Sequence, residues 1–162
     1  MAHFFHANEV AKAAVEIEQK GREFYLRVAD KAQNEELRDF FRYLADEESK
    51  HEEIFANLLE RLGSVELPAW STKEEYADYL RSLIESHSLF NGGLAEKYMS
   101  DADDADTAIR MAMGFEKDTI LFFMEMRDMV PAKERGAVER CIDEERLHLR
   151  RLDEMLTRMR QS

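Results

Sequence analysis

Hydrophobic residues recur at alternating intervals of three and four residues along four long stretches of the chain. This spacing gathers them on one face of an α-helix, as in helices that pack side by side in a bundle. We predict long helices over residues 8–31, 35–62, 104–129 and 131–160, and a shorter one over residues 73–90. The expected fold is therefore all-α: an antiparallel four-helix bundle with a long connection between its second and third helices, which contains the extra short helix.

Residues suited to helix ends support these boundaries. Asn8 and Asn34 are expected to cap the first two long helices, and Thr72 and Glu75 have the spacing of a capping box ahead of the short one. Gly63 follows the second helix, where a glycine commonly ends one. The chain is otherwise poor in helix breakers, since its 162 residues include only 6 Gly and 2 Pro.

Composition and charge narrow the class of protein. The chain is 44% hydrophobic and 36% charged, and its 162 residues suit one globular domain, expected to span residues 1–162. A formal net charge of −12 would repel nucleic acid and anionic membrane surfaces, so we expect neither as a partner. No stretch approaches the ~20 apolar residues of a membrane span. Because Cys141 is the single cysteine and the N-terminus lacks a signal-peptide pattern, we expect the protein in the reducing cytoplasm.

Carboxylates and imidazoles interrupt the hydrophobic faces at only a few positions. The face of the second helix reads Leu37, Phe41, Leu44, Glu48, His51, Phe55, Leu58 and Leu62. The face of the fourth reads Val138, Cys141, Glu145, His148, Leu152, Met155 and Met159. The hydrophobic faces of the first and third helices each contain one carboxylate, which is Glu18 on the first helix and Glu116 on the third. In chain order, the four hydrophobic faces therefore contain one, two, one and two of these polar residues. No Lys or Arg lies on the four faces.

The two halves of the chain repeat one design. Thirty residues separate Glu18 from Glu48, and twenty-nine separate Glu116 from Glu145. The sequence Asp-Glu-Glu-x-x-His occurs in the second helix and again in the fourth. Two helical hairpins of this design that face each other would bring four carboxylates and two imidazoles to one level of the bundle.

Such a buried cluster needs a compensating charge. An isolated carboxylate in an apolar core protonates rather than remaining ionised. Two divalent cations balance four carboxylates when both imidazoles are neutral. The spacing Glu-x-x-His sets its two side chains roughly 5–6 Å apart on one helix face, so both can reach one metal or bridge to a neighbour. Mixed carboxylate and imidazole ligands suit iron or manganese, with zinc as an alternative, and we predict two metal ions per site.

The predicted ligands divide by position. Glu48 and Glu145, within the Glu-x-x-His motifs, are the better candidates to bridge both ions. Glu18 and Glu116 would then be terminal ligands, and each ion would take the histidine of one motif. Tyr25, two turns along the first helix from Glu18, is a candidate hydrogen-bond donor behind the ligands.

These motifs resemble the rubrerythrin-type branch of the ferritin-like superfamily. The residues that carry the likeness lie on all four long helices: Glu18-x6-Tyr25, Glu48-x-x-His51, Glu116 and Glu145-x-x-His148. The resemblance implies a ferritin-like bundle with a di-iron centre that reacts with hydrogen peroxide or dioxygen, often in defence against oxidative stress. It also implies a homodimer or a higher homo-oligomer, since ferritin-like bundles usually pair.

Two features depart from that family's pattern. Rubrerythrins carry a rubredoxin-like iron site on four cysteines, whereas this chain has Cys141 alone, so electrons would come from another protein. Rubrerythrins also have a further Glu three residues after the ligand of the third helix, where this sequence has Thr119. The resemblance therefore implies a simpler six-ligand site, closer to that of bacterioferritin.

The leading hypothesis is an oxidoreductase, a rubrerythrin-like peroxidase or oxidase, that reduces peroxide or dioxygen with electrons from an external donor protein. A protein that binds iron or another metal for storage, delivery or sensing, without turnover, would use the same ligands. A purely structural helical module would leave the site empty.

Other polar side chains near these motifs are given simpler interpretations. His87 is expected to be a surface or packing residue of the short helix, and Cys141 a buried, inert thiol. Glu47 and Glu144 precede the two motif glutamates and are expected to face solvent or another subunit. Beyond the metal ligands, no separate general acid or base is assigned.

Overall fold

Five α-helices account for most of the residues that the structure describes. The computed structural model describes residues 7–62, 72–87 and 104–162. The helices in these ranges are α1 (Ala7–Lys31), α2 (Glu35–Arg61), α3 (Lys73–Ser86), α5 (Ala105–Met129) and α6 (Ala132–Gln161). The described residues contain no strand, so the prediction of an all-α protein is confirmed.

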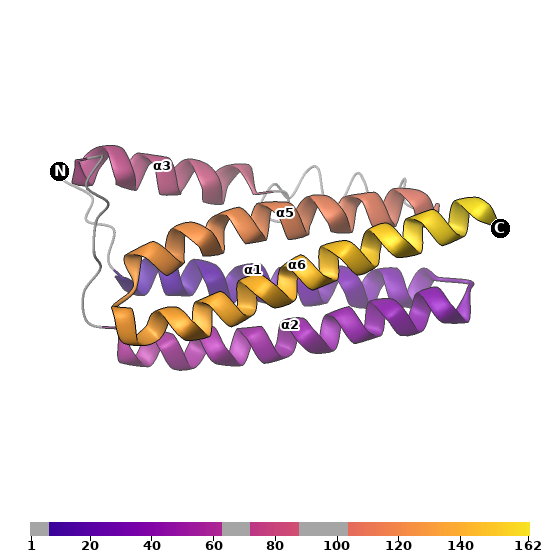
Figure 1. The fold of residues 1–162 in the computed structure, drawn as a ribbon, viewed down its shortest axis with the longest axis horizontal. Coiled ribbons are helices and arrows are strands. Elements are labelled where there is room, and N and C mark those ends of the chain that lie inside the picture. Colours follow the sequence, from indigo (N-terminus) through magenta and orange to yellow (C-terminus); the bar gives the residue numbers. More distant parts are fainter. Residues whose placement is uncertain (1–6, 63–71, 88–103) are drawn as a thin grey trace.

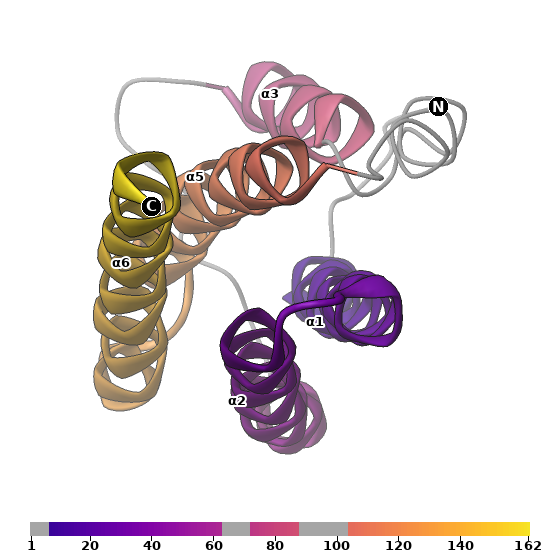
Figure 2. The same ribbon diagram turned by 90° about the vertical axis from the view of Figure 1, so that its right-hand side faces the viewer.

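The four long helices form two antiparallel hairpins that pack into a bundle (Figures 1 and 2). α1 pairs with α2 along its length, and α5 pairs with α6. The turns of the two hairpins lie at opposite ends of the bundle (Figure 1), so the connection from α2 to α5 has to span its length. α3 belongs to this connection and lies outside the bundle, next to α5 (Figure 2). The predicted crossover with its extra helix is therefore confirmed.

Two helices, α2 and α3, begin at the caps that the sequence indicated. The Asn34 side chain accepts hydrogen bonds from two backbone N–H groups in the first turn of α2. Thr72 and Glu75 form the predicted capping box at the start of α3. The Asp104 side chain accepts from the first turn of α5. These side chains satisfy N–H groups that have no partner within their own helix.

Two predicted boundaries are wrong by a few residues. Asn8 lies inside α1, which begins at Ala7, and is therefore not its cap; terminal turns commonly shift by a residue or two because few hydrogen bonds hold them. α3 ends at Ser86 rather than at residue 90, because His87 takes an extended backbone conformation with ψ of 130°. Gly63 lies outside the described residues.

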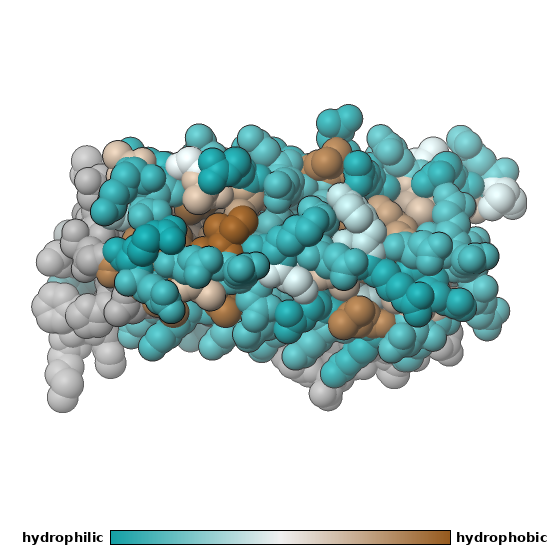
Figure 3. Space-filling view, turned by 90° about the horizontal axis from the view of Figure 1, so that it is seen from below, coloured by the Kyte–Doolittle hydropathy of each residue, from teal (hydrophilic) through white to brown (hydrophobic). Residues whose placement is uncertain are grey.

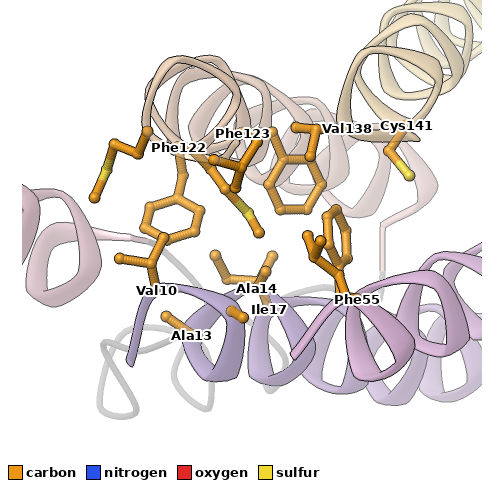
Figure 4. Close-up of a cluster of buried hydrophobic side chains, with 14 of the residues drawn as sticks. Val10, Ala13, Ala14, Ile17, Phe55, Phe122, Phe123, Val138 and Cys141 are labelled. Atoms are coloured by element: carbon orange, nitrogen blue, oxygen red, sulfur yellow. The ribbon is translucent and has the colours of Figure 1, made fainter. Parts of the chain in front are cut away.

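The core of the bundle consists of two hydrophobic clusters. On α1, one cluster uses residues 10–17 and the other residues 24–29, which leaves residues 18–23, nearly two helical turns, between them for polar side chains. In the first cluster, the rings of Phe55 and Phe123 join α2 to α5 with centroids 4.6 Å apart, and Cys141 lies nearby on α6 (Figure 4). Such aromatic contacts contribute about 0.5–1.5 kcal/mol beyond the burial of their surface. The two clusters therefore hold the four helices together on both sides of one polar layer.

Polar side chains cover most of the outside. The face drawn in Figure 3 is largely hydrophilic, and its hydrophobic side chains form separate spots. Within residues 9–62, 72–87 and 104–162, the exposed large hydrophobic residues are Leu26, Leu121 and Leu147, each on a different helix. Among the described residues, no helix has an apolar stretch long enough to cross a membrane.

Candidate metal centre

Six polar side chains meet in the layer between the two hydrophobic clusters. All are buried, with at most 4% of any one exposed to solvent. They are Glu18 on α1, Glu48 and His51 on α2, Glu116 on α5, and Glu145 and His148 on α6. The structure thus brings together all six residues that the sequence predicted as ligands.

The six side chains form two overlapping groups. One contains the α1 carboxylate and the α2 histidine, the other contains the α5 carboxylate and the α6 histidine, and both include Glu48 and Glu145. Within each group, one potential ligand atom from every residue lies within 4.8 Å of the others. Two cations held in this way would share Glu48 and Glu145. This geometry agrees with the predicted division into bridging and terminal positions, while metal binding itself stays a prediction.

A glycine makes room for one of the shared carboxylates. Gly21 lies one turn after Glu18 on α1, and a Cβ atom at this position would lie 3.3 Å from Oε2 of Glu48. That separation is tighter than most Cβ contacts, so any larger residue would press on the carboxylate. In the second hairpin the corresponding position, one turn after Glu116, is Thr119.

Glu145 lies at the centre of the cluster and contacts both histidines. Its Oε1 is 2.8 Å from Nδ1 of His51, and its Oε2 is 2.9 Å from Nδ1 of His148. The two imidazole rings are stacked, with centroids 5.9 Å apart. Burial would raise the pKa of Glu145, but the hydrogen bonds from His148 and His51 lower it well below its usual range. Glu145 is therefore held as a carboxylate.

The other three carboxyl groups favour their neutral forms. Burial, and then the negative charge of Glu145, raises the pKa of Glu18, Glu48 and Glu116 well above the usual carboxyl value. For His51, burial alone would lower the pKa, but Glu145 and Glu48 raise it to about 11. The cluster thus attracts positive charge, whether from protons or from cations.

Some buried oxygens of the cluster have no hydrogen-bonding partner among the described residues. They are both carboxylate oxygens of Glu18 and Oε1 of Glu48. Buried polar atoms are nearly always paired in folded proteins, and an unpaired one costs ~1–3 kcal/mol. Divalent cations bind carboxylate oxygens, and iron, manganese and zinc also accept imidazole nitrogen. The chemistry of this donor set therefore fits two metal ions.

The outward-facing nitrogens of the two histidines have different surroundings. Nε2 of His51 lies 2.5 Å from an oxygen of Glu144, whose side chain is 46% exposed. The matching residue on α2, Glu47, pairs with Lys50 instead, and Nε2 of His148 has no partner among the described residues. Glu144 therefore faces solvent in part, as expected, and also contacts a histidine of the opposite hairpin, which the sequence analysis missed. The repeated Asp-Glu-Glu-x-x-His sequence could not have indicated this contact, because Glu47 holds the same place in the repeat and pairs with Lys50.

Tyr25 contacts the cluster through the opposite hairpin. Its hydroxyl donates a hydrogen bond to Oε1 of Glu116 on α5, although its spacing along α1 relates it to Glu18. Burial, and then the charge of Glu116, raises the pKa of Tyr25 well above its usual value. The hydroxyl therefore keeps its proton and remains a donor.

Two further side chains lie close to the polar layer. His87 is a buried packing residue rather than a surface one, and its Nε2 lies 3.1 Å from Oγ1 of Thr119. Burial lowers the pKa of His87 to about 4, so the ring is neutral at physiological pH. Cys141 is buried as predicted, and burial raises the pKa of its thiol to about 12, which keeps it protonated and inert.

The fold and the buried cluster define the class of protein: a ferritin-like four-helix bundle with a carboxylate and histidine centre. A crystal structure from Thermotoga maritima, assigned as a ferritin-like diiron-carboxylate protein, matches it with a TM-score of 0.65 and 22% sequence identity. The match covers 97% of this chain and 98% of that one. No curated protein sequence matches the chain. The sequence model of the rubrerythrin family matches residues 9–156, and the chain therefore belongs to the rubrerythrin family.

Proposed function

We propose that this protein is a di-iron oxidoreductase that reduces hydrogen peroxide or dioxygen with electrons from an external donor protein. The observation that carries the proposal is the pair of overlapping ligand groups that share Glu48 and Glu145. Membership of the rubrerythrin family, and the likeness to a protein assigned as diiron-carboxylate, favour iron over manganese or zinc.

The residues of the cluster would divide the work of holding the metal pair. Glu48 and Glu145 would bridge the ions, and the carboxylates of α1 and α5 would each bind one ion. Iron, when bound, supplies the redox chemistry. Tyr25 keeps a proton on its hydroxyl and orients the carboxylate of Glu116. The hydrophobic clusters on both sides keep bulk water away from this layer.

The source of electrons follows from the cysteine content. The 162 residues include one cysteine, Cys141, so they cannot form a four-cysteine iron site. Its buried thiol, held protonated by a raised pKa, is also unsuited to redox exchange. We therefore assign the reducing electrons to a separate donor protein.

A metal-storage or sensing protein is the second candidate. It is favoured by Thr119, which stands where the family resemblance implies a further glutamate. A site without that carboxylate has one negative ligand fewer to support repeated oxidation and reduction. Such a protein would bind iron and undergo one oxidation without turnover.

The first test is metal content. Apoprotein is offered Fe²⁺ without oxygen, and the iron, manganese and zinc retained per chain are measured beside a Glu48→Ala, Glu145→Ala double variant. We expect two iron ions per chain in the wild type and their loss in the variant, because both ions depend on the shared carboxylates. A wild-type protein that retains no metal would refute the proposal.

Turnover separates the two candidates. Iron-loaded, reduced protein receives repeated additions of hydrogen peroxide together with a chemical reductant, and the peroxide consumed per chain is counted. Continued consumption over many additions, absent from the double variant, supports the oxidoreductase. Consumption that stops after a single oxidation of the bound iron supports the storage protein instead.

A further inference from the structure

Polar contacts attach α3 to the bundle at both of its ends. Near its start, the hydroxyls of Tyr76 and Tyr79 donate to the two oxygens of Glu125 on α5, at 2.8 and 3.0 Å. At its end, Nε2 of His87 lies 3.1 Å from the hydroxyl oxygen of Thr119, also on α5. The two contacts fix both the position of α3 along α5 and the place that the imidazole takes.

The metal centre as described above does not account for His87. Its side chain is only 1% exposed, and it comes from the crossover helix rather than from the bundle. Burying a polar ring costs free energy that a leucine of similar size would not. A neutral imidazole also offers one N–H donor and one acceptor, so His87 can direct the hydrogen bonding of its partner.

That partner, Thr119, lies beside the ligands. It is buried, and it follows Glu116 by one turn on the inward face of α5. Gly21 holds the equivalent position of the first hairpin, where a Cβ would lie 3.3 Å from the shared carboxylate of Glu48. The internal repeat gives Thr119 the equivalent position in the second hairpin, one turn after Glu116 on the same face of its helix. Among the described residues, the one hydrogen-bonding partner of the Thr119 side chain is His87. The Thr119 hydroxyl can therefore form a further hydrogen bond with a group at the cluster.

The contact lies on the side of the cluster that the histidine ligands leave open. Both histidines and both shared carboxylates come from α2 and α6, whereas α1 and α5 supply one carboxylate each. α3 lies against α5, on the side of the bundle away from α2 (Figure 2). A small molecule that approaches metal ions in this site therefore meets fewer ligand side chains on the α1 and α5 side, where Thr119 lies.

We propose that His87 is a positioning residue for small molecules that bind at the metal pair. Its Nε2–H donates to Oγ1 of Thr119, and the hydroxyl of Thr119 in turn donates to peroxide, dioxygen or a small anion bound from the α1 and α5 side. The crossover helix thereby has a role at the centre, which is to hold the imidazole in place. This inference rests on the proposed function, since it requires metal ions in the site.

Azide is the probe, because it is a small anion that binds open positions on ferric ions and produces an absorption band of its own. Thr119→Val removes the hydroxyl with little change of shape, and His87→Leu removes the ring nitrogens. We expect both variants to keep two iron ions per chain and to bind azide about tenfold more weakly, as the loss of one hydrogen bond predicts. Thr119→Ser and His87→Gln keep the donor groups and should bind azide within about threefold of the wild type.

A control variant separates positioning from general loosening of α3. Tyr79→Phe removes one contact of the same helix with Glu125 and should leave azide affinity unchanged. Wild-type affinity in Thr119→Val, with iron bound, overturns this inference and leaves the di-iron proposal intact. Weakening in Thr119→Val but not in His87→Leu overturns the role of His87. If His87→Leu does not fold, His87→Gln carries the test, and azide binding more than about threefold weaker than in the wild type overturns that role. A wild-type protein without iron overturns both proposals.

Discussion

Replacing Glu144 with alanine should weaken one of the two metal positions and spare the other. Glu144 accepts a hydrogen bond from Nε2 of His51, the nitrogen that faces away from the cluster. Nδ1 of the same ring faces the carboxylates. A carboxylate that accepts from the outer nitrogen fixes the tautomer and orientation of a metal-binding imidazole and makes it a stronger ligand. His148 has no such partner among the described residues.

The size of the effect follows from the contact. The two atoms are 2.5 Å apart, and the imidazole is fully buried while the Glu144 side chain is 46% exposed. Hydrogen bonds to charged groups contribute ~1.5–3 kcal/mol, and solvent screening of a half-exposed carboxylate places this one at the lower end. A loss of about 1.5 kcal/mol weakens binding about tenfold. The ion bound by His51 should show this loss.

Anaerobic titration of apoprotein with Fe²⁺, followed by calorimetry, measures the two affinities. Glu47→Ala is the matched control, since Glu47 occupies the same place in the other hairpin but pairs with the exposed Lys50. Such a surface pair contributes little to stability because solvent screens it, and neither metal affinity should change by more than about twofold. Equal weakening in both variants, or none in Glu144→Ala, would refute the reasoning.

Three further predictions follow from the cluster. Gly21→Ala should lower metal affinity, because its Cβ would lie 3.3 Å from the Glu48 carboxylate, while urea unfolding of the apoprotein shows a gain of up to ~1 kcal/mol in helix stability. Tyr25→Phe should cost the apoprotein about 1 kcal/mol in the same assay, since Glu116 loses a buried donor. Raising the pH from about 5 to about 8 should destabilise the apoprotein in thermal melts: Glu18, Glu48 and Glu116 have raised pKa values, so the folded state holds protons that the unfolded state releases. Metal-loaded protein, whose ions replace those protons, should not show that loss.

The sequence alone was sufficient for the helices and for the membership of the cluster. Helix formation depends on neighbours three and four residues apart and on caps such as Asn34, all of which are visible in the chain itself. Glu18 and Glu116 each stand alone on an otherwise hydrophobic face. Buried carboxylates on separate helices are tolerable only when they share a counter-charge. Because burying each carboxylate alone would cost too much free energy, the sequence predicts that they lie at one level of the bundle.

The tertiary structure decided which side chains meet across helices. Tyr25 donates to Glu116 rather than along its own helix, and Glu144, but not Glu47, reaches a histidine of the opposite hairpin. His87 directly follows α3, whose hydrophobic pattern does not indicate which face of the bundle that helix covers, and only the structure places the imidazole on Thr119. Such contacts depend on the rotation and axial offset of each helix against its neighbours. These offsets arise from the packing of whole faces, whereas periodicity along one helix reports only which side of that helix is buried.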